Sequence, residues 1–124
     1  MGPVLVVEDD EDIREGIAEV LRDEGYAVVE ASDGVEGLER ADAENAPSLV
    51  LLDLTMPRMS GPEFVRALRS RAAFSRVPIV LLTGASDPHD HVRELGAVGA
   101  LPKPFSLAAL IDVVAREARR DASF

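Results

Sequence analysis

The residues best suited to chemistry form a short acidic run near the start of the sequence. Residues 4–12 read VLVVEDDED, so four apolar residues lead directly into the five acids Glu8–Asp12. Neighbouring carboxylates repel one another, and taking a carboxylate out of water is costly. A hard divalent cation would neutralise such a cluster, and a ligand set made only of oxygen atoms suits Mg²⁺. The acidic run therefore indicates a candidate magnesium site.

Three later apolar segments also lead into polar residues, namely Asp53, Thr83 and Lys103. If these segments are parallel strands of one sheet, their carboxyl ends meet at the edge where open α/β sheets place their binding sites. We therefore expect the three residues to lie close to Glu8 and Asp9. An ammonium group at such a site has a natural partner in an anion brought to the cation.

The segments that must position these residues alternate between apolar runs and helical patterns. Short apolar runs predict strands at Val4–Val7, Ala27–Ala31, Leu49–Leu52, Ile79–Leu82 and Ala97–Leu101. Capping residues and prolines predict helices that begin at Asp10, Ser32-Asp33-Gly34, Pro62, Asp87-Pro88 and Ser106. The first helix should end near Glu24 and the second by about Pro47. The apolar runs are continuous and not alternating, which predicts a parallel sheet buried between two layers of helices.

Pro102 gives information about strand order. Proline lacks a backbone N–H group, so it is confined to edge strands and strand ends. The fifth strand, which leads into Pro102, should therefore lie at an edge of the sheet.

Composition limits the classes of function. A chain of 124 residues suits one domain, and the absence of cysteine excludes disulfides and thiolate metal sites. The net charge of −10 argues against direct nucleic-acid binding, which relies on Lys and Arg. The longest apolar run is far shorter than the roughly 20 residues of a membrane helix. No secretory signal is visible, so we expect no membrane association and a cytoplasmic location.

Five segments together resemble the receiver domain of two-component response regulators. They are VLVVEDDEDIRE, ASDGVEGL, LVLLDLTMPRMSG, PIVLLTG and GALPKPF, and in this order and spacing they are highly specific. The resemblance covers nearly the whole chain and implies a single receiver domain over residues 1–124. It also implies the α/β fold of chemotaxis regulators. That fold is a doubly wound (βα)5 flavodoxin-like three-layer sandwich whose parallel strands run in the order 2-1-3-4-5.

The resemblance implies that Mg²⁺ is bound by Glu8, Asp9, Asp53 and the backbone carbonyl of Thr55. Asp9 would be a direct ligand, whereas Glu8 would act mostly through water. Asp10 falls outside the matched pair of acids and is more simply a helix cap.

The same resemblance makes Asp53 the phosphate acceptor. Thr83 would donate a hydrogen bond to one phosphoryl oxygen, and Lys103 would pair with another. These roles agree with general chemistry, because a carboxylate is a usable nucleophile for phosphoryl transfer. The barrier is lowered mainly by in-line positioning and by cancelling charge on the transferring oxygens.

By resemblance, the phosphoryl donor is a phosphohistidine on a histidine kinase or a phosphotransfer protein. The chain has no nucleotide-binding loop, so we expect a phosphorelay switch and not an enzyme that turns over ATP. Phosphorylation would change the surface formed by the fourth helix, the fifth strand and the fifth helix. The identity of the kinase, the output and dimerisation stay open. The chain could be a stand-alone regulator or one part of a longer protein.

Two alternatives belong to other classes of function. A magnesium-dependent phosphatase with an aspartyl nucleophile needs a second acid two positions after the first, and that position is Thr55 here. A non-phosphorylated interaction module is expected to have lost the acid pair, the acceptor or the lysine, and all of these are present. The phosphoacceptor switch is therefore the leading hypothesis.

The sequence departs from the family pattern at Ala100. Many family members have Tyr or Phe three residues before the conserved lysine, and that ring moves inward when the switch closes. Alanine has no rotamer to change, so any coupling must be carried by other residues. The loop after the fourth strand, which begins at Gly84, is the simplest alternative.

Overall fold

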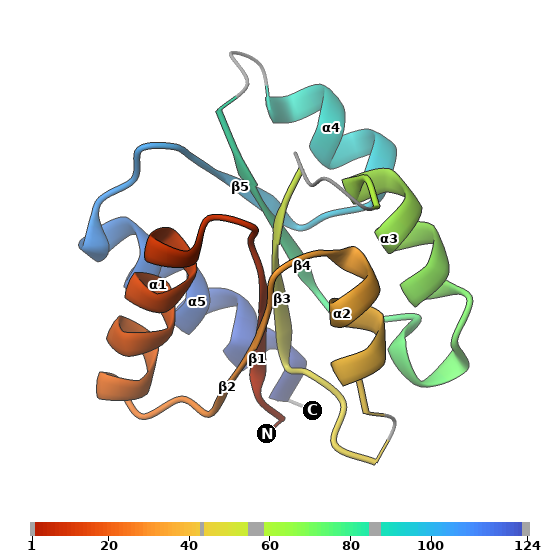
Figure 1. The fold of residues 1–124 in the computed structure, drawn as a ribbon, viewed down its shortest axis with the longest axis horizontal. Helices are drawn as coiled ribbons and strands as arrows, with labels where there is room; N and C mark the ends of the chain where they lie inside the picture. The colour runs from red at the N-terminus through yellow and green to blue at the C-terminus, as the bar shows by residue number, and fades with distance from the viewer. Residues whose placement is uncertain (1, 43, 55–58, 85–87, 123–124) are drawn as a thin grey trace.

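The structure is a computed structural model that describes residues 2–42, 44–54, 59–84 and 88–122. Strands and α-helices alternate along these residues, as the sequence predicts (Figure 1). The strands are β1 (Val4–Val7), β2 (Val28–Ala31), β3 (Leu49–Asp53), β4 (Ile79–Thr83) and β5 (Gly99–Pro102). The helices are α1 (Glu11–Asp23), α2 (Gly34–Arg40), α3 (Gly61–Arg69), the short 3-10 helix η1 (Ala72–Phe74), α4 (Pro88–Leu95) and α5 (Leu107–Ala122).

The strands form one parallel sheet in the order β2-β1-β3-β4-β5. This is the order implied by the family resemblance, and it places β5 at an edge, as Pro102 predicts. Every residue of β1, β3 and β4 is buried, whereas β2 and β5 are partly exposed, as befits edge strands. The continuous apolar runs therefore belong to the strands that helices cover on both faces.

Two layers of helices enclose the sheet, with α1 and α5 on one face and α2, α3 and α4 on the other (Figure 1). Alternate residues of each strand point to opposite faces. On β1, Val4 and Val6 pack in the core with α1 and α5, whereas Leu5 and Val7 pack in the core with α3. Each face of the sheet thus has its own hydrophobic core.

The strand register aligns the carboxyl ends of the central strands. Val7 of β1 lies opposite Leu52 of β3, so the next residues, Glu8 and Asp53, are neighbours across the sheet. Asp53 in turn lies opposite Leu82 of β4. The sheet therefore brings the first acidic run and the candidate acceptor to the same edge.

Polar side chains cap the helices, at Asp33 and Ser106 where the sequence predicts and at Ser60 one residue before α3. Asp33 and Ser106 accept hydrogen bonds from the amides of Glu36 and Ala109, and Ser60 forms a reciprocal capping box with Glu63. These caps fix where each helix leaves the loop at the carboxyl end of a strand.

Several strand ends differ from the sequence prediction by one residue, and two boundaries differ by more. Helix α2 ends at Arg40, well before Pro47, and the Asp42 carboxylate then accepts the amide of Glu44 at 2.9 Å. Such a local side-chain bond competes with continuation of the helix. Strand β5 begins at Gly99 and not at Ala97. The chain turns out of α4 at Gly96, at φ +68°, and the Ala97 amide still donates to the Val92 carbonyl of α4 at 3.0 Å.

Candidate functional site

The acidic run divides into two sets with different roles. The Oδ1 atom of Asp10 accepts the amide of Ile13 at 3.1 Å and so caps α1. Glu11 and Asp12 are exposed in the first turn of α1, where the helix dipole favours negative charge. Only Glu8 and Asp9 are therefore left to face the carboxyl end of the sheet.

Glu8, Asp9 and Asp53 form a compact carboxylate cluster. Each contributes one oxygen, and the three oxygens lie within 4.8 Å of one another. Glu8 is completely buried and Asp53 is 5% exposed, whereas Asp9 is open to solvent. The cluster is thus a polar site set into the sheet edge with one accessible side.

Lys103 reaches into this cluster from the segment after β5. Its Nζ atom lies 2.6 Å from Oε1 of Glu8 and 3.5 Å from Oδ1 of Asp53. Its backbone amide donates to the Thr83 carbonyl at 2.8 Å, which fixes the base of the side chain against β4. Partial burial would lower the pKa of Lys103, but the hydrogen bond and charge of Glu8 and the charge of Asp53 outweigh it. The pKa is therefore raised.

The electrostatics of Asp9 also reflect its neighbours. Partial burial raises the pKa of this carboxyl group, but hydrogen bonds with the side chains of Asp53 and Glu8, aided by the charge of Lys103, lower it by more. The net pKa lies below the ordinary value of 3.8. Asp9 is therefore ionised at neutral pH and is available to a cation.

The other expected residues stand as follows. Thr83 is the last residue of β4, is buried, and lies opposite Pro102 across the sheet, next to Lys103. Thr55 follows the described part of β3 and lies outside the described residues. The structure therefore brings Glu8, Asp9, Asp53 and Lys103 together, with Thr83 on the adjoining strand.

One contact of this site was not predicted from the sequence. The Nη1 atom of Arg14 donates to the backbone carbonyl of Glu8 at 3.0 Å. In the sequence Arg14 is an ordinary charged residue of a surface helix. The contact depends on how α1 packs against the sheet, so no local sequence pattern points to it.

The match to known protein families settles which class of domain has this arrangement. The family model described as the response regulator receiver domain matches residues 4–115. The chain belongs to the response regulator receiver family. The function of this family is phosphoacceptor signalling, and the acidic cluster of this receiver occupies the sheet edge where that chemistry is expected.

Its relatives include both kinases and regulators. The receiver is 44% identical over 110 residues to hybrid signal transduction histidine kinase D of Dictyostelium discoideum, covering 87% of this chain and 7% of that protein. It is 41% identical over 114 residues to the transcriptional regulatory protein PdtaR of Mycobacterium tuberculosis, covering 90% of this chain and 54% of PdtaR. The chain thus spans about half the length of one relative and a small part of the other.

Solved structures agree with this fold. The chemotaxis response regulator CheY4 of Vibrio cholerae is 36% identical, with a TM-score of 0.84 over 94% of this chain and 98% of that chain. The receiver domain of sensor histidine kinase PA1611 from Pseudomonas aeruginosa is 28% identical, with a TM-score of 0.82 over 96% of this chain and 99% of that chain. That structure has a magnesium ion coordinated in its active-site cleft.

The donor set of this receiver fits a magnesium ion. Glu8, Asp9 and Asp53 offer only carboxylate oxygens, which Mg²⁺ prefers, and no His or Cys joins the cluster among the described residues. Three carboxyl groups face the single ammonium of Lys103, so a divalent cation would compensate their remaining charge. Glu8, Asp9 and Asp53 are the described residues that would hold it.

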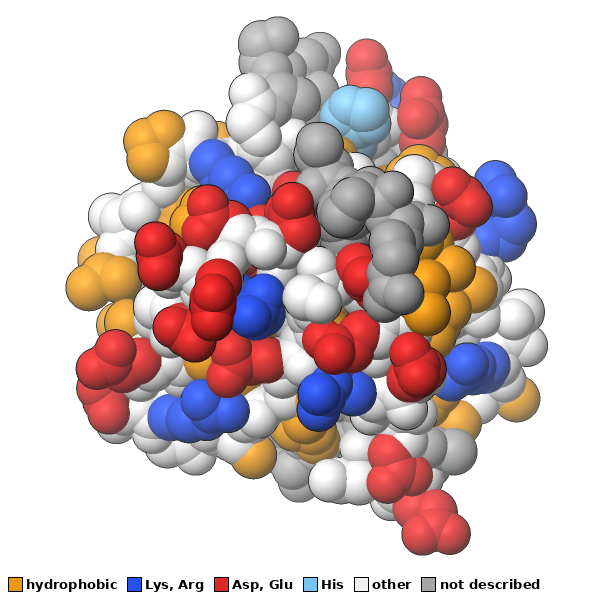
Figure 2. All heavy atoms as spheres, in the orientation of Figure 1, with side chains coloured by type: hydrophobic (Ala, Val, Ile, Leu, Met, Phe, Trp, Pro, Cys, Tyr) orange, Lys and Arg blue, Asp and Glu red, His pale blue; other side chains and the backbone are white. Residues whose placement is uncertain are grey.

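The surroundings of the site are acidic and largely polar. Figure 2 shows Asp and Glu side chains gathered on the side of the molecule where α1 lies. A recess of about 320 Å³ next to Lys103 is an exception, because it is lined mainly by apolar residues of α1, the segment after β5 and α5.

Among the described helices, none combines the length and the apolar character needed to cross a membrane.

Proposed function

We propose that Asp53 of this receiver accepts a phosphoryl group from a phosphohistidine in a magnesium-dependent two-component phosphorelay. The observation that carries the proposal is the convergence of Glu8, Asp9 and Asp53 on Lys103 at the carboxyl edge of the sheet. Under this proposal residues 1–124 act as one receiver domain. It is phosphorylated and then loses the group, without turning over an external phosphomonoester.

The transfer assigns a role to each side chain. A carboxylate oxygen of Asp53 attacks the phosphorus, and the phosphorus–nitrogen bond breaks with its electron pair passing to the imidazole of the donor. Lys103 lies 3.5 Å from Asp53 Oδ1, so its ammonium can pair with an oxygen of the incoming phosphoryl group. Thr83, on the neighbouring strand, supplies a neutral hydroxyl donor. Bound Mg²⁺ would offset negative charge on the phosphoryl oxygens, with the Thr55 carbonyl as a further ligand.

The charge on Lys103 suits this role. Its raised pKa keeps it fully protonated at neutral pH, when an anion must be held. In the structure Glu8 binds this ammonium at 2.6 Å. A cation that engages Glu8 would leave Lys103 freer to pair with a phosphoryl oxygen.

The partner is proposed to be a histidine kinase or a phosphotransfer protein. The apolar recess beside Lys103 supports this proposal, because it offers Ile13, Phe105 and the exposed side chain of Leu107 to a protein surface. The output would come from another segment of a longer protein or from a separate protein that recognises the α4, β5 and α5 surface. We propose that the relay operates in the cytoplasm.

Phosphorylation with a small donor tests this assignment. After incubation with acetyl phosphate and Mg²⁺, intact-mass analysis should show one added phosphoryl group, and Asp53→Asn should show none. Asp10→Asn is the matched control, because it makes the same chemical change two residues from Glu8 and keeps a good helix cap. Phosphorylation that persists in Asp53→Asn would exclude Asp53 as the acceptor.

A further inference from the structure

The peptide group that joins Glu8 to Asp9 is held by a side chain of α1. Nη1 of Arg14 donates to the carbonyl oxygen of Glu8 at 3.0 Å, while the Glu8 amide donates to Ala31 of β2 at 3.0 Å. The Asp10 amide then donates to Oε2 of Glu8 at 3.2 Å. The turn that carries both proposed metal ligands is therefore fixed on each side.

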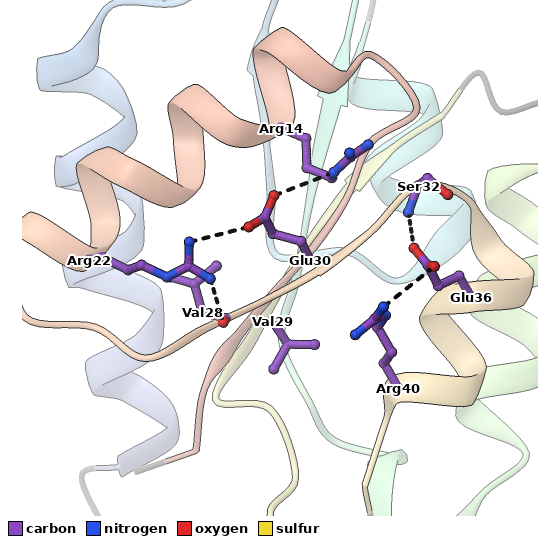
Figure 3. A pocket seen from close by; sticks show the side chains of 8 residues that line it. All are labelled: Arg14, Arg22, Val28, Val29, Glu30, Ser32, Glu36 and Arg40. Atoms are coloured by element: carbon purple, nitrogen blue, oxygen red, sulfur yellow. Dashed lines mark hydrogen bonds and ion pairs between the residues drawn. The ribbon is translucent and has the colours of Figure 1, made fainter.

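Arg14 is itself held in place by Glu30 on β2. Figure 3 shows Glu30 between two arginines of α1, with Oε1 facing Arg14 Nε at 3.5 Å and Oε2 facing Arg22 Nη1 at 3.2 Å. The two arginines differ in their other contacts. Arg22 donates to the carbonyl of Val28 and its side chain is 51% exposed, whereas the side chain of Arg14 is 14% exposed. Of these two arginines, Arg14 is the one that links Glu30 to the acidic turn.

We propose that Arg14 is a positioning residue for the magnesium site. It locks the Glu8–Asp9 peptide so that both carboxylates face Asp53, and Glu30 keeps its guanidinium aimed at that peptide. This inference rests on the proposed function, because it requires that the receiver binds Mg²⁺. Groups that orient metal ligands commonly change metal affinity by about 10- to 100-fold when they are removed.

Two possible actions of Arg14 predict opposite results. If Arg14 acted only through its positive charge, removing it would strengthen Mg²⁺ binding, because a cation near the site would be lost. If Arg14 acts by positioning, removing it weakens binding, because the carboxylates lose their fixed geometry. Arg14→Lys separates the two further, since a single ammonium keeps the charge but cannot reproduce the planar fork that meets Glu8 and Glu30 together.

Calorimetric titration with Mg²⁺ provides the direct test. We expect Arg14→Ala to raise the magnesium dissociation constant by about tenfold, and Arg14→Lys to raise it by a smaller factor. Arg22→Ala, which removes the same charge and also breaks a contact with Glu30, should leave the constant unchanged. In acetyl phosphate reactions the variants of Arg14 should need more Mg²⁺ for half-maximal rate, while the rate at saturating Mg²⁺ stays close to that of the parent.

Amide exchange in the metal-free protein gives a readout that does not depend on magnesium binding. The Asp10 amide should exchange faster in Arg14→Ala and be unchanged in Arg22→Ala. Equal or tighter Mg²⁺ binding by Arg14→Ala, or equal weakening by Arg22→Ala, would overturn the inference. If Arg14→Ala does not fold, the magnesium dissociation constant of Arg14→Lys tests the inference instead, and a constant equal to or below that of the parent would overturn it. A parent that binds no Mg²⁺ would refute the proposed function itself, which distinguishes the two failures.

Discussion

The two halves of the site are built from different kinds of residue. On the β1 and β3 side, buried Glu8 and Asp53 are set between two hydrophobic cores and tied by hydrogen bonds and ion pairs. On the β4 and β5 side, Thr83 is followed by exposed Gly84, and Ala100 on β5 is half-buried. The first half concentrates negative charge between two hydrophobic cores, whereas the second half, apart from the Lys103 ammonium that reaches across to Glu8 and Asp53, is small and neutral. We therefore expect the acceptor chemistry to centre on β1 and β3, and the response to it to pass through β4 and the segment after it.

The largest effect expected from this contrast is stabilisation of the fold by Mg²⁺ bound at the carboxylates of β1 and β3. Mg²⁺ should stabilise the receiver, because it binds the folded cluster and relieves repulsion between Glu8, Asp9 and Asp53. At a magnesium concentration 100 times the dissociation constant, the gain in unfolding free energy would be about 2.7 kcal/mol. Thermal or urea unfolding with and without Mg²⁺ measures it.

The control is a neighbouring acid outside the cluster. Asp9→Ala should abolish most of the stabilisation, whereas Asp12→Ala, which removes an exposed acid of the first turn of α1, should keep it. A stabilisation of equal size in both variants would show that Mg²⁺ acts on the general negative charge and not on this site.

The contrast also explains which features the sequence could predict. Glu8, Asp53, Thr83 and Lys103 each follow an apolar strand closely, so the parallel sheet alone places them at one edge. The contact of Arg14 with Glu8 depends instead on the rotation of α1 against the sheet and on Glu30 of β2, which no local pattern encodes. A sequence shows which residues directly follow a strand, but it does not show how a helix packs against the sheet.

Boundaries in loops were predicted less well for a related reason. The early end of α2 rests on a competing side-chain bond at Asp42, and the late start of β5 rests on the conformation of Gly96. These are small differences in free energy between alternative local structures, so composition alone does not decide them. The roles of Thr83, Lys103 and the Thr55 carbonyl in phosphoryl binding stay predictions.

A second prediction of intermediate size concerns Lys103. It is the only lysine in the sequence, so its side-chain NMR signals can be assigned without ambiguity. Its pKa should lie above the ordinary value of 10.5, because the hydrogen bond and charge of Glu8 and the charge of Asp53 outweigh the effect of partial burial. Glu8→Gln should lower this pKa, since it removes the closest negative charge. An unchanged pKa in Glu8→Gln would contradict the assignment of Glu8 as the dominant partner.

The sign of the accompanying stability change follows from the same shift. A raised pKa in the folded state means that the ammonium contributes stability at pH values below 10.5, and this contribution is lost as pH rises through the folded pKa. Asp9 behaves in the opposite sense, because its lowered pKa gives stability above pH 3.8 that is lost as pH falls through the folded value. The pH dependence of unfolding in Glu8→Gln should therefore change at the alkaline end.

The smallest expected effect belongs to the β4 and β5 side. Ala100 lies opposite Leu81 across the sheet and packs against the core below α3 and α4, but it has no side-chain rotamer to switch. We therefore predict that the signal of phosphorylation passes from Thr83 through residues 84–91, of which 85–87 lie outside the described residues. Glycine at position 84 supplies backbone freedom for such a change. Amide exchange with and without beryllofluoride, a mimic of the phosphoryl group, should show modest changes across this segment and little around Ala100.

Variants of Thr83 decide whether its hydroxyl transmits this change. In Thr83→Ala the changes across residues 84–91 should disappear, because no donor remains to contact the phosphoryl mimic. Thr83→Ser is the matched control, since it keeps the hydroxyl and removes only a methyl group, and it should preserve them. Changes centred on Ala100, or changes across residues 84–91 that survive in Thr83→Ala, would show that the neutral half of the site responds by another route. Changes centred on Ala100 would make β5, and not the segment after β4, the element whose two arrangements phosphorylation biases.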